Sequence, residues 1–295
     1  MDHRPDWKIW ALLLPAVSFF LVFALGPLVA AFYISFLEWD GISDPEWAGA
    51  ANWTRALTDP VTLKSILLTL QVIVLSWLIQ TPLSILLGTF TAGYQRYRAV
   101  LSVFFFLPLL FSAVAVGLIW QAILSPGGAA NSFLEGIGAS ALTEPWLGNP
   151  DTALYAVIIV IAWQFIPFHT LLYQAGVRQI PTVLYEAARI DGAGAVRQFF
   201  TITLPQLKYT VITSTILIVS GSVTYFDIIF IMTGGGPENA TRILPMHMYI
   251  TAFQETQIGY GSAIAMLLIA LGLMFSLVLL KISGFARMES QAEGA

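Results

Sequence analysis

Long uncharged stretches recur along the chain, and short polar segments separate them. Each stretch is apolar over about 20 residues, the length that an α-helix needs to cross about 30 Å of hydrocarbon. A carboxylate occurs inside only one of them, at Asp227. The pattern therefore predicts an all-α integral membrane protein with six transmembrane helices in a single domain over residues 1–295. The predicted spans are 9–37, 65–91, 100–124, 153–177, 209–232 and 257–281.

Composition supports a membrane protein. Of the 295 residues, 57% are hydrophobic and 10% are charged, whereas an ordinary globular domain carries about 25% charge. So few charges do not cover a surface that faces water. The first apolar stretch is about twice the roughly 7–15 residues of a signal-peptide core, so we expect an uncleaved anchor. The absence of cysteine excludes disulfides and thiolate metal sites.

The distribution of basic residues predicts which loops face the cytoplasm. With the N-terminus inside, ten of them fall in inner segments and three, Arg55, Lys64 and Arg242, fall in outer ones. Such a bias is typical of the cytoplasmic side. We therefore expect both termini in the cytoplasm. The net charge of −4 reflects carboxylates in the outer loops and does not indicate an acidic partner surface.

One inner segment, about residues 178–208, is unusually polar between two apolar spans. Its sequence predicts two short helices, separated by a turn at Asp191-Gly192 because glycine accepts the left-handed conformation that ends a helix. Glu186 and Arg189 lie together on one face of the first helix. The two apolar faces comprise Val183, Leu184, Ala187 and Ile190 in the first helix and Val196, Phe199, Phe200 and Leu204 in the second.

Periodicity alone leaves two functions open for this segment. It could lie on the inner leaflet as an interfacial helix. Alternatively, it could dock a cytoplasmic partner, with its apolar face held against the membrane helices and with Glu186 and Arg189 exposed. The spacing of the residues does not separate these two possibilities.

The segment resembles the EAA loop of ABC-importer permeases. That loop has the pattern E-A-A, three residues, glycine, nine residues and I-x-L-P, and Glu186-Ala187-Ala188, Gly192 and 202–205 match every spacing. The preceding "QIPTVLY" is similar to the form found in carbohydrate-importer permeases. Further similar stretches are 49–53, 106–134 and 225–241, and they resemble the larger permease subunit of maltose-type and glycerol-phosphate-type importers.

The resemblance implies one half of a channel for a mono-, di- or oligosaccharide, with a polyol or a glycerol-phosphate-type solute as the alternative. It also implies a second permease chain, two ATPase subunits that bind ATP and Mg²⁺, an extracytoplasmic solute-binding protein and a bacterial or archaeal inner membrane. This chain itself would bind no cofactor, and we expect no nucleic-acid partner. Residues that would couple to the ATPase are Glu186, Ala187, Ala188, Arg189, Asp191 and Gly192.

Other classes of protein fit the sequence less well. The chain lacks G-x-x-x-x-G-K-[ST], so it has no loop for ATP phosphates, and it has no evident catalytic triad. Its histidines, His3, His169 and His247, are far apart, so we expect no metal site and no enzyme. An ion-coupled secondary transporter would hold several ionisable groups in the membrane, whereas this chain has one membrane carboxylate.

Asp227 is the first candidate for the substrate path, with Tyr225 and Ser222 close by in sequence. An ionised carboxylate inside a transmembrane helix is costly unless it faces water or a partner. We therefore expect it to face the protein interior. It could bind sugar hydroxyls beside an aromatic ring, or it could pair with the second permease, and the sequence leaves both roles open.

The fourth predicted span adds further candidates around Pro167, which should kink the helix. Gln164, Phe165 and Phe168 occupy the region that, by resemblance, lines a sugar site. Packing or contact with lipid is the plainer explanation of the two aromatic rings. Gln71, Gln80 and Gln121 are further membrane amides, whose usual role is to bond neighbouring helices.

Overall fold

The computed structural model describes residues 7–93 and 95–283. By sequence it divides into two compact units: unit 1 comprises residues 1–63 and 247–270, and unit 2 comprises residues 64–246 and 271–295. The single domain over residues 1–295 stays a prediction.

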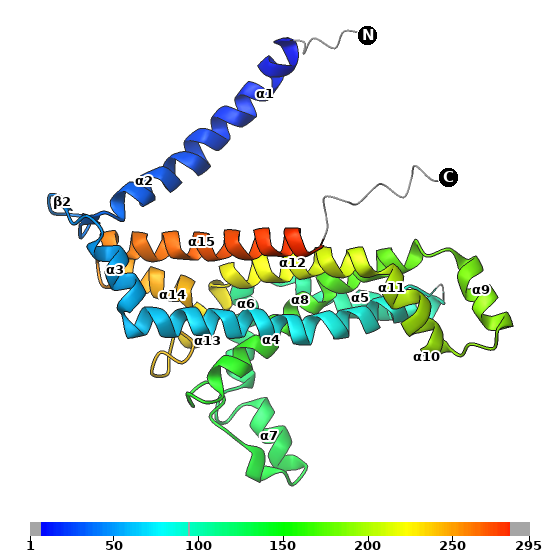
Figure 1. Cartoon of the computed structure of the whole chain (residues 1–295). Helices are drawn as coiled ribbons and strands as arrows, with labels where there is room; N and C mark the ends of the chain where they lie inside the picture. Colours follow the sequence, from blue (N-terminus) through cyan, green and yellow to red (C-terminus); the bar gives the residue numbers. More distant parts are fainter. Residues whose placement is uncertain (1–6, 94, 284–295) are drawn as a thin grey trace. The chain divides into compact units, whose positions relative to one another are not determined.

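Unit 1 begins with a nearly continuous apolar helix in three segments (Figure 1). Its elements are α1 (Trp7–Phe20), η1 (Leu21–Leu25), α2 (Gly26–Ile34), β1 (Leu37–Glu38), β2 (Glu46–Trp47), α3 (Ala51–Thr58) and η4 (Ile250–Gln254). The helix ends at Ile34, three residues before the predicted end of the first span. The chain then turns into a hairpin because the Asp40 carboxylate accepts the N–H groups of Ile42 and Ser43, each at 2.8 Å.

Unit 2 carries most of the long helices. Its elements are α5 (Arg96–Leu110), α6 (Ala113–Ile123), α7 (Ala129–Gly136), η2 (Ser140–Leu142), α8 (Ala153–Arg178), α9 (Thr182–Ile190), α10 (Ala195–Gln198), η3 (Phe199–Thr203), α11 (Leu204–Gln206), α12 (Lys208–Thr224) and α13 (Asp227–Thr233). Three helices contribute residues to both units: α4 (Pro60–Thr91), α14 (Leu244–Tyr249) and α15 (Ile258–Ser283).

Four helices of the described chain are long and apolar enough to cross a membrane, and the number rises to six if each of two bent pairs forms one span. The four are Leu12–Ile34, Pro60–Thr91, Ala153–Arg178 and Ile258–Lys281. The bent pairs are Arg96–Leu110 with Ala113–Ile123, at 97°, and Ala195–Gln206 with Lys208–Thr224, at 67°. The predicted all-α membrane fold is therefore confirmed, but two of the predicted spans are not straight helices.

The predicted third span, 100–124, is broken at Phe111 and Ser112. Two hydrogen bonds account for the corner. Ser112 caps α6 by accepting the N–H of Ala115 at 3.2 Å, and the side-chain amide of Gln164 on α8 donates to the Phe111 carbonyl at 3.2 Å. Buried backbone groups freed at a break require partners of this kind inside a membrane.

The predicted fifth span, 209–232, is also interrupted. Helix α12 ends at Thr224, Tyr225 adopts an extended backbone with ψ 117°, and α13 restarts at Asp227. A carboxylate in the first turn favours a helix start because it meets the positive end of the helix dipole. Gly234, with φ +61°, then closes α13 in the left-handed conformation.

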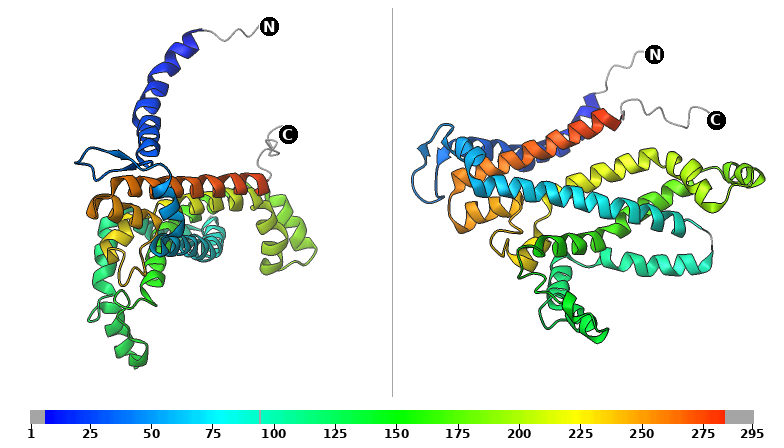
Figure 2. Two further views of the ribbon diagram at one scale, coloured as in Figure 1. Left: turned by 60° about the vertical axis from the view of Figure 1, so that its left-hand side comes forward. Right: turned by 60° about the horizontal axis from the view of Figure 1, so that its bottom comes forward.

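The centre of unit 2 is α8, which packs against α5, α6, α12 and α13; Figure 2 shows these helices in two further views. Helix α4 approaches α8 closely at Gly88, where a Cβ atom would lie 2.6 Å from Cβ of Tyr173. Because such a Cβ would also lie 3.0 Å from the backbone nitrogen of Gln174 and the carbonyl oxygen of Thr170, a larger residue would force the two helices apart. This close contact holds the two long helices together beside the polar residues described below.

Candidate functional site

The segment 181–206, which we call the elbow, leaves the end of α8 and returns at the start of α12 (Figure 1). Its first helix, α9, ends at the predicted turn: Gly192 has φ +75°. The N–H of Gly192 donates to the Arg189 carbonyl at 3.0 Å, and that of Ala193 donates to Ala188 at 2.8 Å. These two bonds form a Schellman end, so the predicted helix–turn–helix is confirmed.

Internal contacts fix the shape of the elbow. The Tyr185 hydroxyl lies 2.9 Å from the Thr203 hydroxyl, and the Gln198 amide donates to the Ala193 carbonyl at 2.7 Å. Phe199 packs against a buried cluster that includes Leu207. The two arms of the elbow are therefore tied to each other and to the helices of unit 2.

The apolar face of the elbow is uncovered. The side chains of Val183, Ile190 and Val196 are 61%, 87% and 72% exposed, and Glu186 and Arg189 are exposed as well. The expectation that the membrane helices would hold this face was therefore wrong for α9 and for Val196, whereas Phe199 and Leu204 of the second apolar face do pack against a buried cluster of unit 2. The inward contacts of the elbow are made by Tyr185, Phe199 and Leu204.

At the far end of α12, Asp227 is exposed. It makes no hydrogen bond or ion pair with the described residues of the chain. The expectation that it faces the interior is therefore not met by this chain alone. Since α12 is 17 residues long, Asp227 lies more than about 25 Å along the helix from the elbow.

Two of the predicted path residues come together beside Asp227. The rings of Phe165 on α8 and Tyr225 have centroids 5.3 Å apart. Phe168 packs edge-on against His169, at 5.2 Å between centroids, and the Nδ1 atom of that histidine lies 2.9 Å from the Ser214 hydroxyl. Phe165 and Tyr225 thus form an aromatic pair, whereas the described ring contact of Phe168 is with His169.

The remaining predicted residues, Gln164 and Ser222, are buried. The Gln164 amide nitrogen is used at the corner after α5, while its oxygen and the Ser222 hydroxyl have no hydrogen-bond partner among the described residues. Gln164 therefore has a structural role at the corner in addition to its predicted contact with substrate. The sequence did not suggest this structural role.

A polar stripe on α4 was missed by the sequence analysis. Ser76, Gln80 and Ser84 repeat every four residues, so they share one helical face, and all three are fully buried. Neither the Ser76 hydroxyl nor the Gln80 amide has a hydrogen-bond partner among the described residues. The four-residue spacing of polar side chains within an apolar span was the pattern that could have revealed this stripe.

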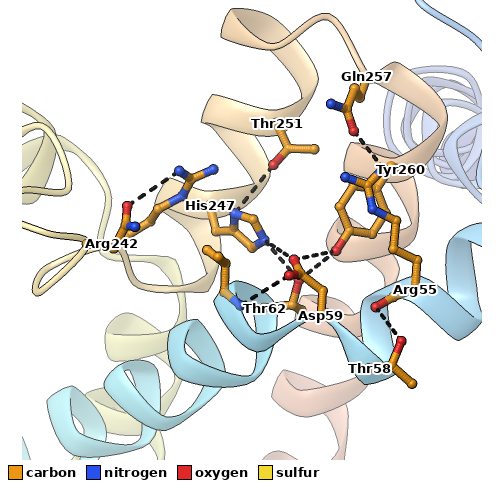
Figure 3. A network of polar contacts seen from close by, with 11 residues as sticks. Arg55, Thr58, Asp59, Thr62, Arg242, His247, Thr251, Gln257 and Tyr260 are labelled. Carbon is orange, nitrogen blue, oxygen red and sulfur yellow. Dashed lines mark hydrogen bonds and ion pairs between the residues drawn. The ribbon is translucent and has the colours of Figure 1, made fainter.

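Unit 1 holds a second polar cluster, in which the groups are paired. Figure 3 shows Asp59, Thr62, His247 and Tyr260 pointing toward one another. Tyr260 and Thr62 donate to the Asp59 carboxylate at 2.9 and 3.0 Å, and Thr62 Oγ1 lies 2.9 Å from His247 Nε2. No pattern in the sequence links these residues, because they come from distant segments.

Hydrogen bonds set the charge state of this cluster. Partial burial alone would raise the pKa of Asp59, but the bonds from Tyr260, Val61 and Thr62 outweigh it and lower the pKa below the ordinary value of 3.8. Asp40, at the hairpin, has its pKa lowered to about 2 by the N–H groups of Ile42 and Ser43. The described residues contain no group of three His, Cys, Asp or Glu side chains that could hold a metal ion.

Comparisons with known proteins identify the family. Residues 80–283 match the model of the binding-protein-dependent transport system inner membrane component. The probable ABC transporter permease protein YurN of Bacillus subtilis is 33% identical over 91% of this chain and 93% of its own length. The trehalose/maltose transport system permease protein MalF of Thermococcus litoralis is 33% identical over 97% of each chain.

The fold agrees with these relatives. A bacterial ABC transporter involved in the import of the acidic polysaccharide alginate superposes with a TM-score of 0.84, covering 97% of this chain and 98% of that one, at 23% identity. The chain therefore belongs to the binding-protein-dependent transport system inner membrane components, the permease subunits of ABC transporters.

Proposed function

We propose that this chain forms one half of the translocation path of an ABC importer for a mono-, di- or oligosaccharide. Membership of the family excludes the ion-coupled secondary transporter considered above. The relative named as a trehalose/maltose permease is similar over almost the whole chain, which supports a saccharide over a polyol or a glycerol phosphate.

The proposal that the elbow docks a separate ATPase rests on its exposed face. At about 100° per residue, Glu186 lies about 40° from Ile190 and about 60° from Val183 around α9. Burying the apolar face in lipid would therefore also move the Glu186 carboxylate toward hydrocarbon, and placing a charge there costs free energy. A protein groove with a basic side chain accommodates both the apolar groups and the carboxylate, so docking is favoured over lying on the leaflet.

Within the elbow, the residues take different parts. Glu186 and Arg189 would form ion pairs with the ATPase, and Ala187 and Ala188 would let α9 approach it closely. Asp191 and Gly192 set the direction of the helix through the Schellman end. ATP and Mg²⁺ would be bound by the ATPase, and this chain would carry no cofactor.

The proposed substrate path lies around Asp227. Its exposed carboxylate, beside the aromatic pair of Phe165 and Tyr225, offers an acceptor for sugar hydroxyls and ring faces for sugar C–H groups. Because this chain leaves Asp227 uncovered, the path would be completed by a second permease. We rank three further residues below that pair as candidates for substrate contact: Ser222, Gln164 and Phe168.

The proposed assembly has the elbow in the cytoplasm, with both termini on the same side, as the excess of basic residues predicts. Its other members would be two ATPase subunits, a different permease chain and an extracytoplasmic solute-binding protein. The family's description as binding-protein-dependent supports the last of these.

Co-purification of the ATPase tests the docking role. Ile190→Ser with Val196→Ser should release the ATPase and abolish sugar uptake by proteoliposomes that contain the whole transporter. The matched control is Phe133→Ser with Ile137→Ser on and after α7, which removes two apolar side chains of similar exposure, 66% and 62%. Equal ATPase retention in both variants would contradict the docking role. Uptake of a non-sugar solute alone would contradict the proposed substrate.

A further inference from the structure

Behind the elbow lies an open pocket of about 300 Å³, which we call the basic pocket. Its walls come from the end of α4, the start of α5, the end of α8 and the inner side of the elbow. The charged residues that line it are Arg98 and Arg178, and the described lining includes no Asp or Glu. Hydroxyl and amide groups of the elbow, from Tyr185, Gln198 and Thr203, complete the polar wall.

Both guanidinium groups bond to backbone carbonyls at the end of α4. Arg98 Nη1 donates to the Phe90 carbonyl at 2.7 Å, and Arg178 Nε donates to the Ala92 carbonyl at 3.4 Å. Arg98 Nε also donates to the Tyr97 hydroxyl at 3.1 Å. Since a guanidinium has five N–H donors, most donors of this pair have no acceptor among the described residues. The pocket therefore offers unused donors to an anion.

A second pocket, of about 250 Å³, lies on the same three helices. We call it the apolar groove. Its lining includes Leu87 on α4, Phe105 and Pro108 on α5, and Trp163, Pro167 and Thr170 on α8. The described lining contains no ionisable side chain, so the groove suits hydrocarbon.

The register of α5 and α8 places a residue of each pocket on one helical face. Arg98 and Phe105 are separated by two helical turns on one face of α5, and Val177 of the basic pocket is separated from Thr170 of the groove in the same way on α8. Two turns correspond to about 10 Å along a helix axis. The groove thus lies about that far from the basic pocket, in the direction away from the elbow.

We propose that the basic pocket binds the phosphate of an anionic phospholipid and that the apolar groove holds one of its acyl chains. Phosphate is the group that paired guanidiniums recognise best, and basic pockets between membrane helices are suited to lipid headgroups. The adjoining groove favours a lipid over a soluble phosphate, which would leave it empty.

This placement has a consequence for the elbow. Because Tyr185, Gln198 and Thr203 also line the basic pocket, the headgroup would brace the elbow from its inner side. The exposed face around Ile190 would stay free for a partner. The lipid site adds to the proposed function and does not depend on which solute is transported.

The test uses the assembled transporter in nanodiscs of phosphatidylcholine mixed with phosphatidylglycerol, followed by native mass spectrometry of retained lipid. Arg98→Gln with Arg178→Gln should lower the affinity for phosphatidylglycerol about 30-fold, which corresponds to about 1 kcal/mol for each basic residue lost. The control, Arg96→Gln with Arg197→Gln, removes the same charge at the same end without touching the pocket. Equal retention in the two variants would overturn the proposal.

Further variants separate lipid binding from damage to the fold. Arg98→Lys with Arg178→Lys keeps the charge and should keep most of the lipid; complete loss would assign the effect to the broken cap of α4 and overturn the site. Leu87→Trp fills the groove and should displace phosphatidylglycerol while both arginines remain. Inorganic phosphate should not compete with the lipid in the unaltered transporter, and competition would reassign the pocket to a soluble anion.

Discussion

The two polar clusters of this chain, one in each unit, are built in opposite ways. In unit 1, Asp59, Thr62, His247 and Tyr260 satisfy one another within hydrogen-bond distance. In unit 2, Gln80, Ser76 and Ser222 are fully buried and make no hydrogen bond of standard geometry with the described residues, although Gln80 and Ser222 lie near the Tyr225 hydroxyl. A satisfied cluster fixes the elements that contribute to it, whereas an unsatisfied one costs free energy unless water, a ligand or another conformation pairs it.

The difference separates polar groups that stabilise the fold from polar groups that suit a transport path. The unit 1 cluster joins α3, α4, α14 and α15 through groups that are already paired, so its role is to stabilise. The unit 2 stripe follows one face of α4 near the aromatic pair of Phe165 and Tyr225. Tyr225 lies at the break in the fifth span. Unused polar atoms at this depth suit a path that is hydrated during part of a transport cycle.

The largest expected effect on stability is that of Asp59→Ala. Removing the carboxylate leaves the Thr62 and Tyr260 hydroxyls without their shared acceptor and should lower the free energy of unfolding by about 3 kcal/mol. Thermal unfolding in detergent measures the loss. Asp44→Ala, at an exposed carboxylate without a hydrogen bond in the described structure, should leave the midpoint unchanged, and equal losses would show that the cluster does not stabilise unit 1.

Acid should reproduce part of this effect. The pKa of Asp59 is lowered in the folded protein, so its contribution is complete above the ordinary pKa of 3.8 and is lost as the pH falls through the lower folded value. Unfolding midpoints measured downward from pH 5 should therefore decline below that ordinary value in the unaltered protein. The decline should be shallower in Asp59→Asn, and parallel curves would refute the linkage.

The elbow provides a third prediction, with an effect of intermediate size that depends on backbone conformation alone. Gly192 has φ +75° with no other group within 4 Å of where a Cβ would lie. Gly192→Val should thus cost about 1–2 kcal/mol from backbone strain and should misdirect α9. We expect ATP hydrolysis to lose its stimulation by substrate, whereas Gly194→Val, in an extended backbone, should retain it. Normal stimulation in both variants would mean that the turn does not aim a docking helix.

Gln80→Leu sharpens the contrast between the two clusters. Since the amide has no partner in the described structure, its replacement by an apolar side chain of similar size should be neutral or stabilising by up to about 1 kcal/mol. Sugar uptake should nevertheless fall. Gln121→Leu is the matched control, because that amide donates to the Met232 carbonyl at 3.4 Å and its loss should destabilise. A destabilised Gln80→Leu would show that the stripe is paired after all.

The sequence predicted those parts of the fold that depend on local chemistry. Apolar length located the membrane helices, and the glycine at 192 located the end of α9, because a left-handed residue is a property of the backbone itself. The corner at Phe111 was not predictable, since it depends on a hydrogen bond from Gln164 on another helix. The same holds for Asp59 and His247, which no periodicity connects.

Site residues were predictable to a similar degree. Phe165 and Tyr225 were proposed separately for the substrate path, from different spans, and their rings lie 5.3 Å apart, while their role in the path stays a prediction. The exposure of Asp227 and of the elbow's apolar face was not foreseen, because a sequence pattern identifies a polar or apolar face without showing whether the same chain covers it. The stripe on α4 was visible in principle, since Ser76, Gln80 and Ser84 share a four-residue spacing.

Asp227→Ala is expected to have the smallest effect on stability and still to impair transport. The side chain is exposed and makes no hydrogen bond or ion pair with the described residues, so the unfolding free energy should change by less than about 0.5 kcal/mol. If the carboxylate accepts sugar hydroxyls beside Tyr225, uptake should fall while the assembled transporter is recovered in normal amounts. Asp227→Asn keeps one acceptor oxygen and should retain part of the uptake, whereas pairing with a basic residue of the second permease predicts loss of assembly in both variants. Measuring uptake and co-purification of the second permease together distinguishes these roles, and unchanged uptake in Asp227→Ala would remove this residue from the path.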